Sequence, residues 1–343
     1  MRRWQFWAGV LISLVFLWLA LRGLKLDDVG AALQTANYGW LLPGVAVYFV
    51  AVWARAWRWH YLLRPLKSIP TNKMFPIVTI GYMGNNIYPA RAGEVLRAYV
   101  LRRREGVPVS ASLATILVER IFDGVVMLMF VFFNLRGLAS LTGASGLAGS
   151  IQAVALWGTA AFTAALVVFL LAAMFPRQSL GLYHRLAAPL LPSKIRERVT
   201  GLLVSFWSGL ESLRSPRNIL MVFLTSVVIW LLETGKYWFV THAFNFSVSF
   251  FALMLMNGIV NLATTIPSAP GYVGTFDAPG IAVLTAYGVE RSVAAGYTLT
   301  LHAALWLPIT LLGAYYMARE GLDWNKVREE YEGLKEVEPT HAL

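Results

Sequence analysis

Ionisable side chains interrupt the apolar stretches of this 343-residue chain, and their spacing suggests what they could do. Arg91, Glu94 and Arg97 follow one another at three-residue steps, which places them close to one face of a helix. An ionisable group at the centre of a bilayer costs at least ~2.5–3.5 kcal/mol, so we expect each to be paired or functional. We expect Arg91 to meet an anionic ligand and Glu94 to pair with Arg97. A self-neutralising structural network is the alternative.

A second group of charges lies on the helix predicted to begin near Val109. At 1.5 Å per residue, Glu119 would be roughly 15 Å from that end, close to the middle of a bilayer. Glu119 and Asp123 share a face, and Arg120 can reach Asp123. Two carboxylates with one guanidinium leave one negative charge, unless Arg91 approaches or a proton is held. The group is therefore either a proton-coupling site or the counter-charge that positions Arg91, and we favour the second.

Glu233 and Lys236 form a third pair at three-residue spacing. They lie roughly 24 Å or more from Arg217 along a helix, beside Tyr237 and Trp238. An aromatic belt and a snorkelling lysine are typical of a membrane interface. We therefore expect this pair to anchor the helix at the outer interface.

The composition indicates a membrane protein. Of the chain, 57% is hydrophobic and 14% is charged, whereas soluble domains carry about 25% charged residues. There are no cysteines, which excludes disulfides and thiolate chemistry, and the five histidines are too far apart in sequence for a local metal motif. We expect no cofactor and no metal. The net charge of +11 comes from basic residues beside apolar runs, so topology explains it better than nucleic-acid binding.

The apolar runs predict an all-α polytopic membrane protein. Each of about six runs is long enough to cross roughly 30 Å of hydrocarbon as a helix. These runs cover about 4–21, 39–57, 110–134, 151–175, 218–242 and 292–317. A cleaved signal peptide is the alternative for the first run, but no small-residue cleavage site follows it.

The distribution of basic residues predicts the orientation. Of 29 Lys and Arg, 22 fall on one side of this layout, including Arg55, Arg58 and Arg97, and four fall on the other. Cytoplasmic loops carry the excess of Lys and Arg, so both termini are expected in the cytoplasm, with the protein in the inner membrane. We expect a single transmembrane domain over 1–320, a cytoplasmic loop at 176–217 and a cytoplasmic tail at 321–343.

Two further apolar stretches, about 74–100 and 250–288, are broken by Pro and Gly near their middle. Basic clusters flank the first on both sides, so it is expected to enter from the cytoplasm and return. The second has external flanks and is expected to enter from the opposite face. Non-helical backbone at membrane depth requires a protein interior or a water-filled cavity, so two re-entrant hairpins imply a cavity. Two kinked full spans are the alternative.

The two broken stretches carry the same pattern. Both read Pro-x-x-x-Gly-x-Val after a polar pair: Pro89 to Val95 follows Asn85 and Asn86, and Pro267 to Val273 follows Thr264 and Thr265. Entry from opposite faces makes this an inverted repeat, whose substrate site lies near the midplane where broken helices meet.

Prolines favour the first turn of a helix, so Pro89 and either Pro267 or Pro270 are expected to start the returning half-helices. Their N-termini would favour an anion between them. The candidate lipid-headgroup site comprises Arg91, Glu94, Arg97, Asn85, Asn86, Gly271 and Asp277, and the candidate hairpin turns comprise Pro89, Gly93, Pro267, Pro270 and Gly274. His302 is either a packing residue or part of this site.

Three ordered motifs resemble the membrane region of lysylphosphatidylglycerol synthetases and the wider flippase-like family: Pro89-Ala-Arg-Ala-Gly-Glu-Val-Leu-Arg97, Val118-Glu-Arg-Ile-Phe-Asp123 and Pro270-Gly-Tyr-Val-Gly-Thr-Phe-Asp277. The resemblance covers most of the chain and implies a lipid-translocating membrane domain, here without the soluble aminoacyl-transferase domain. The family pattern implies a Glu where Asp277 stands and an Arg near His302. The positions that it implies are Arg91, Gly93, Glu94, Arg97, Glu119, Arg120, Asp123, Pro270, Gly271 and Gly274.

We therefore expect a lipid translocator rather than an enzyme. An anionic phospholipid or a polyprenyl phosphate would pass its headgroup through a midplane cavity, and a separate lipid-modifying enzyme is a possible partner. One alternative is a membrane enzyme that modifies a lipid headgroup with Glu119 and Asp123 as acid and base. Another is a small-anion or proton-coupled transporter.

Overall fold

The computed structural model describes residues 3–22, 24–88, 91–141, 171, 175–186, 192–266 and 268–321, and these contain helices and no strand. The α-helices are α1 (Arg3–Leu21), α2 (Leu26–Gln34), α3 (Leu41–Leu63), α4 (Thr71–Ile87), α5 (Ala92–Glu105), α6 (Val109–Leu141), α8 (Pro176–Leu186), α9 (Ser193–Gly209), α10 (Pro216–Thr241), α11 (Phe250–Ala263), α12 (Asp277–Ala286) and α13 (Arg291–Arg319). Short 3-10 turns are η1 (Tyr38–Trp40), η3 (Glu211–Arg214) and η4 (Pro270–Tyr272).

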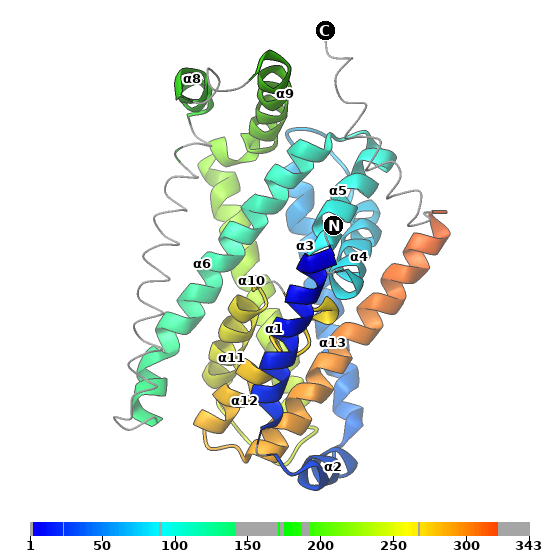
Figure 1. Ribbon diagram of the computed structural model, residues 1–343, viewed down its shortest axis with the longest axis vertical. Coiled ribbons are helices and arrows are strands. Elements are labelled where there is room, and N and C mark those ends of the chain that lie inside the picture. Colours follow the sequence, from blue (N-terminus) through cyan, green and yellow to red (C-terminus); the bar gives the residue numbers. More distant parts are fainter. Residues whose placement is uncertain are drawn as a thin grey trace.

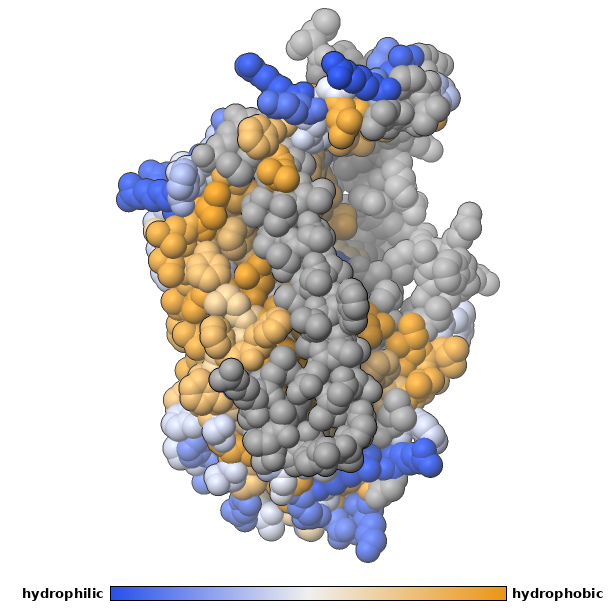
Figure 2. All heavy atoms as spheres, turned by 90° about the vertical axis from the view of Figure 1, so that its left-hand side faces the viewer, coloured by the Kyte–Doolittle hydropathy of each residue, from blue (hydrophilic) through white to orange (hydrophobic). Residues whose placement is uncertain are grey.

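Three of the described helical segments are long and apolar enough to cross a membrane: Tyr38–Leu63, Pro216–Thr241 and Arg291–Arg319. They correspond to three of the predicted spans. Two more predicted spans are occupied by α1, with 19 residues, and by α6, whose 33 residues include the charged group near its middle. The span predicted at 151–175 lies almost entirely outside the described residues. On the face that Figure 2 shows, hydrophobic side chains gather at middle height and hydrophilic ones gather at both ends.

Helices α4 and α5 pack against each other as a hairpin that occupies Thr71–Glu105, close to the predicted 74–100. The two helices approach closely because Gly81 and Gly84 of α4 face Gly93 of α5. A Cβ on Gly93 would lie 1.9 Å from the carbonyl oxygen of Gly81, and a Cβ on Gly84 would lie 2.7 Å from Cα of Gly93. The chain enters α5 through Arg91, which adopts a left-handed conformation with φ 53°. The tip of this hairpin is therefore a strained, closely packed turn.

Helices α11 and α12 form the second pair, which occupies most of the predicted 250–288. An irregular segment joins them. Within it, Gly271, Tyr272 and Gly274 all have positive φ, and Gly274 packs on α1, where an added Cβ would lie 2.6 Å from the Ser13 carbonyl oxygen. Figure 1 places the α4–α5 and α11–α12 pairs toward opposite ends of the molecule.

The predicted helix starts at the prolines need a correction. Pro270 begins η4, and α12 begins seven residues later at Asp277, because the glycines with positive φ interrupt the helix between them. Asp277 caps the turn instead: its Oδ2 accepts a hydrogen bond of 2.9 Å from the Gly274 N–H. Pro89 and Pro267 lie outside the described residues.

Each hairpin has its own apolar core. The first core packs α4 and α5 against α3 and α6, and it contains fully buried Trp59 and Ile77. The second packs α11 and α12 against α10 and α13, and it contains fully buried Leu253 and Leu284. Helix α13 also packs on α4 and α3 on α10, so the two cores are joined. Polar and charged side chains gather where they meet.

Candidate functional site

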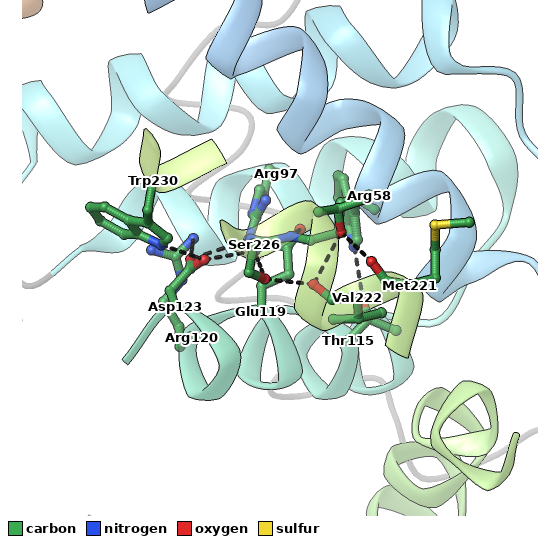
Figure 3. Close-up of polar contacts among 12 residues, drawn as sticks. Arg58, Arg97, Thr115, Glu119, Arg120, Asp123, Met221, Val222, Ser226 and Trp230 are labelled. Atoms are coloured by element: carbon green, nitrogen blue, oxygen red, sulfur yellow. Dashed lines mark hydrogen bonds and ion pairs between the residues drawn. The ribbon is translucent and has the colours of Figure 1, made fainter. Parts of the chain in front are cut away.

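Arg58 of α3 is the centre of a buried ion network and is only 1% exposed. Its guanidinium donates to both oxygens of Asp123 on α6, at 2.6 and 3.2 Å, and to Ser226 Oγ on α10 at 2.6 Å. Its Nε lies 3.7 Å from Glu119 Oε1. Figure 3 shows these side chains converging from three helices. The prediction that placed Arg58 in the cytoplasm is wrong, because α3 continues to Leu63 and carries Arg58 into the core.

Arg97 and Arg120 complete the network. Arg97 Nη2 donates to Glu119 Oε2 at 2.6 Å, and Arg120 lies 3.4 Å from Asp123 as the spacing predicted. Arg120 also lies 3.5 Å from Glu94, which in turn lies 3.8 Å from Arg91. Arg97 therefore pairs with Glu119 rather than with the expected Glu94.

Arg55, Glu233 and Lys236 form a second buried triad. Glu233 of α10 accepts from Arg55 of α3 and pairs with Lys236 one turn along its own helix. The Lys236 ammonium also lies 4.3 Å from the ring centroid of Tyr48, a cation–π contact. The prediction of an interfacial anchor is wrong, because packing of α10 against α3 buries the pair. The prediction that Arg55 is cytoplasmic is wrong for the same reason.

A polar cavity of about 130 Å³ lies between the two hairpins. Its charged lining consists of four basic side chains and one carboxylate: Arg55, Arg91, Arg120, Lys236 and Glu233. Residues of both hairpin tips also line it, among them the polar Asn85, Asn86 and Thr264, and Gly271. Glu119 and Asp123 do not line it, since the network of arginines encloses them.

A wider apolar groove of about 600 Å³ adjoins this cavity. Apolar side chains such as Ile87, Val273 and Leu299 form much of its wall. Four residues belong to both spaces: Asn86, Gly271, His302 and Trp306. The cavity and the groove therefore share a wall.

The hairpin tips meet at Arg91. Its guanidinium lies over the Tyr272 ring, 5.9 Å from the centroid, and donates at 3.5 Å to the Thr264 carbonyl oxygen. Arg91 and Tyr272 are the non-glycine residues with positive φ in the part of the chain that the structure describes. Such strain persists where the surroundings impose it and is typical of functional sites.

Asp277 and His302 form a separate pair beside the cavity. His302 Nδ1 lies 2.9 Å from Asp277 Oδ1, and Nε2 lies 2.7 Å from the Gly271 carbonyl oxygen. The Phe276 ring lies against the imidazole at a tilt of 32°, with a centroid distance of 4.5 Å. His302 is thus hydrogen-bonded to the second hairpin and also lines the cavity.

The structure brings most of the predicted residues into one region. Of the headgroup candidates, Asn85, Asn86, Arg91 and Gly271 line the cavity, and Glu94 and Asp277 contact lining residues. Arg97 instead pairs with Glu119, which does not line the cavity. Sequence reasoning missed Arg55, Arg58, Glu233 and Lys236 as site residues. A signal was available for the first pair: the aromatic run of Trp57, Trp59 and Tyr61 continues the apolar span past both arginines. Among the described residues, no three His, Asp or Glu side chains are arranged to hold a metal ion.

Comparison with known proteins shows several relatives of this chain. Over 343 aligned positions, the chain is 26% identical to a protein named glycosyltransferase AglD of Haloferax volcanii, and the match covers 91% of this chain and 54% of that protein. The chain thus spans about half the length of that relative. A UPF0104 membrane protein of Methanothermobacter thermautotrophicus is 24% identical, over 81% of this chain and 83% of its own.

A second UPF0104 membrane protein, from Methanocaldococcus jannaschii, is 23% identical over 89% of this chain and 91% of its own. The profile of the lysylphosphatidylglycerol synthase transmembrane region matches residues 6–313, which include both hairpins and the ion network. The chain therefore belongs to the family of lysylphosphatidylglycerol synthase transmembrane regions.

Proposed function

We propose that this protein moves an anionic phospholipid or a lipid-linked phosphate across the bilayer, with the headgroup passing through the polar cavity. The main observation in support is the charge of the cavity lining, which has four basic side chains and one carboxylate. Unpaired charges buried in protein are costly, so a ligand that supplies negative charge is favoured there.

The partners behind the lining do not cancel this excess. Counting both clusters, six basic groups face four carboxylates: Arg55, Arg58, Arg91, Arg97, Arg120 and Lys236 against Glu94, Glu119, Asp123 and Glu233. Nε of Arg55, Arg91 and Arg120 is buried without a hydrogen-bond acceptor in the described part of the chain. A phosphate brings several acceptor oxygens together, and guanidinium groups suit them well.

The adjoining groove favours a lipid over a small anion. A phospholipid needs a polar space for its headgroup and an apolar space for its chains at the same time. The cavity and the groove supply these on either side of Asn86, Gly271, His302 and Trp306. A site for a small anion would have no use for an apolar groove of about 600 Å³ at its wall.

The charge distribution supports the orientation that we propose. With Arg55, Arg58 and Arg97 assigned to the buried clusters, 19 basic residues remain on the cytoplasmic side against four outside. Both termini would then be cytoplasmic, in the inner membrane. The hairpins α4–α5 and α11–α12 would enter from opposite faces, as inverted repeats do.

A lipid-modifying enzyme is the second candidate, because one relative is named a glycosyltransferase. The proposed acid and base, Glu119 and Asp123, are each 1% exposed and held by Arg97 and Arg58, away from the cavity lining. This placement does not suit proton exchange with a substrate. A chemically altered lipid after incubation with purified protein would favour this candidate.

The test is lipid movement in reconstituted vesicles. Fluorescent phosphatidylglycerol in the inner leaflet becomes accessible to dithionite only after it crosses the bilayer. We expect the wild type to increase accessibility, Arg91→Ala to abolish the increase and Arg91→Lys to retain part of it. Arg103→Ala removes an exposed charge of the same hairpin and is the matched control, expected at the wild-type rate. The proposal fails if Arg91→Ala moves the lipid as fast as Arg103→Ala, or if no anionic lipid in a broad panel moves.

A further inference from the structure

The contacts of His302 determine how many protons it shares with Asp277. The Gly271 carbonyl oxygen can only accept, so Nε2 of the imidazole carries a hydrogen and donates it at 2.7 Å. The Nδ1 atom faces Asp277 Oδ1 at 2.9 Å, and this contact also needs one hydrogen between the two atoms. An ionised carboxylate opposite the lone pair of a neutral imidazole would repel it.

The second oxygen of Asp277 is already used. Oδ2 accepts from the Gly274 N–H at 2.9 Å, and the carboxylate stands in the first turn of α12, where the helix dipole favours negative charge. The shared proton therefore belongs on His302. The pair therefore consists of an ionised carboxylate and an imidazolium, which is one proton more than a carboxylate with a neutral imidazole. Its imidazole lines both the cavity and the groove.

We propose that Asp277 and His302 form a proton-binding site that couples lipid movement to a proton. The proposal rests on the proposed function, since the coupling partner is the anion in the cavity. Histidine is the side chain whose charge changes most readily near neutral pH, so a proton can be taken up and released here.

The charged groups around the cavity set the sign of the coupling. Asp277, which contacts His302, and Glu233 of α10 favour the imidazolium. The basic residues that line the cavity with His302 oppose it: Arg55 of α3, Arg91 of the first hairpin tip, Arg120 of α6 and Lys236 of α10. Asn86, Tyr272 and Trp306 add no charge in their usual neutral forms. An anion in the cavity offsets the opposing charges, so binding of the anion favours protonation, and protonation favours binding by the same factor.

The first test measures the proton itself and does not depend on transport. The chain has five histidines, so ¹⁵N-histidine NMR in nanodiscs is tractable, with the His302 signals assigned by His302→Gln. At one fixed pH, adding dihexanoylphosphatidylglycerol should raise the ratio of protonated to neutral His302 about tenfold. Dihexanoylphosphatidylcholine should not raise this ratio, and the spectrum of the exposed His242 should be the same in all samples. An unchanged ratio at His302 overturns the proposal.

The second test separates the two proposals. Lipid movement by the wild type should depend on pH, whereas His302→Arg, which keeps donors and charge but cannot release a proton, should be pH-independent and slower. His242→Gln is the matched control and should keep the wild-type pH profile. If the wild type and His302→Arg move lipid with the same pH profile, the proton site is refuted and the lipid-transport proposal stands. An anion-dependent shift of His302 without any lipid movement refutes transport and leaves the proton site standing.

Discussion

Arg58 offers the sharpest test of the buried network. It is 1% exposed and donates to both oxygens of Asp123 and to Ser226. Replacing it by methionine keeps much of the side-chain volume and removes the charge. Asp123 would keep Arg120 at 3.4 Å and the Trp230 N–H at 3.0 Å, and Glu119 would keep Arg97.

The expected cost follows from the burial. Removing one partner of a buried ion pair costs about 3–5 kcal/mol, because the other charge is left buried without compensation. The remaining partners of Asp123 place Arg58→Met at about 3 kcal/mol, near the low end of that range. Asp123→Leu should cost a similar amount. The double variant removes both charges together, so it should be more stable than the sum of the single losses predicts, by about 2 kcal/mol.

The free energy of unfolding can be measured in mixed detergent micelles by titration with dodecyl sulfate. The same cycle on Lys67 and Glu105 is the control. These side chains lie 2.8 Å apart, and because the lysine is exposed to water, the coupling should be at most about 1 kcal/mol. Additive losses for Arg58 and Asp123 would refute the argument, because they would mean that the two side chains do not depend on each other.

Three further predictions concern the hairpin, the cytoplasmic end and the second triad. Gly93→Ala should lower the unfolding midpoint sharply, since its Cβ would overlap the α4 backbone, whereas Gly181→Ala, with no atom within 4 Å, should not. The hydrogen bond from a lysine ammonium lowers the pKa of Glu105 in the folded protein. The ionised carboxylate therefore stabilises the fold above the unfolded-state pKa, and this stabilisation is lost as the pH falls through the folded-state pKa. The difference in unfolding free energy between the wild type and Glu105→Gln, measured from pH 7 down to about pH 3, should therefore disappear. Glu233→Gln should lower the unfolding free energy more than Lys236→Met does. The first change leaves the buried cations Arg55 and Lys236 without their carboxylate, whereas the second leaves the Arg55–Glu233 pair in place.

Much of the helical layout was predictable because it depends on local sequence. Pro and Gly at the centre of two apolar stretches predicted where each helix pair would break, and the breaks fall near Arg91 and between Thr264 and Phe276. The pairing of Arg120 with Asp123 was predictable for the same reason, since it needs only one helical turn.

The partners of the charged residues were not predictable from one sequence. Arg58 and Asp123 are 65 residues apart, and Arg55 and Glu233 are 178 apart, so only the packing of α3 against α6 and α10 brings them together. An arginine near the end of an apolar run has the same local pattern whether it faces water or a buried carboxylate. Similarly, Glu233 and Lys236 have the pattern of an interfacial pair until α3 covers them.

The central claim is that the cavity holds the headgroup of an anionic lipid. Native mass spectrometry of the protein released from nanodiscs of mixed native lipids tests it directly. We predict one bound phospholipid or lipid-linked phosphate of negative charge on the wild type and on Arg103→Ala, and its loss from Arg91→Ala. An equal occupancy of the same lipid on Arg91→Ala, or only zwitterionic lipid on the wild type, would contradict the account.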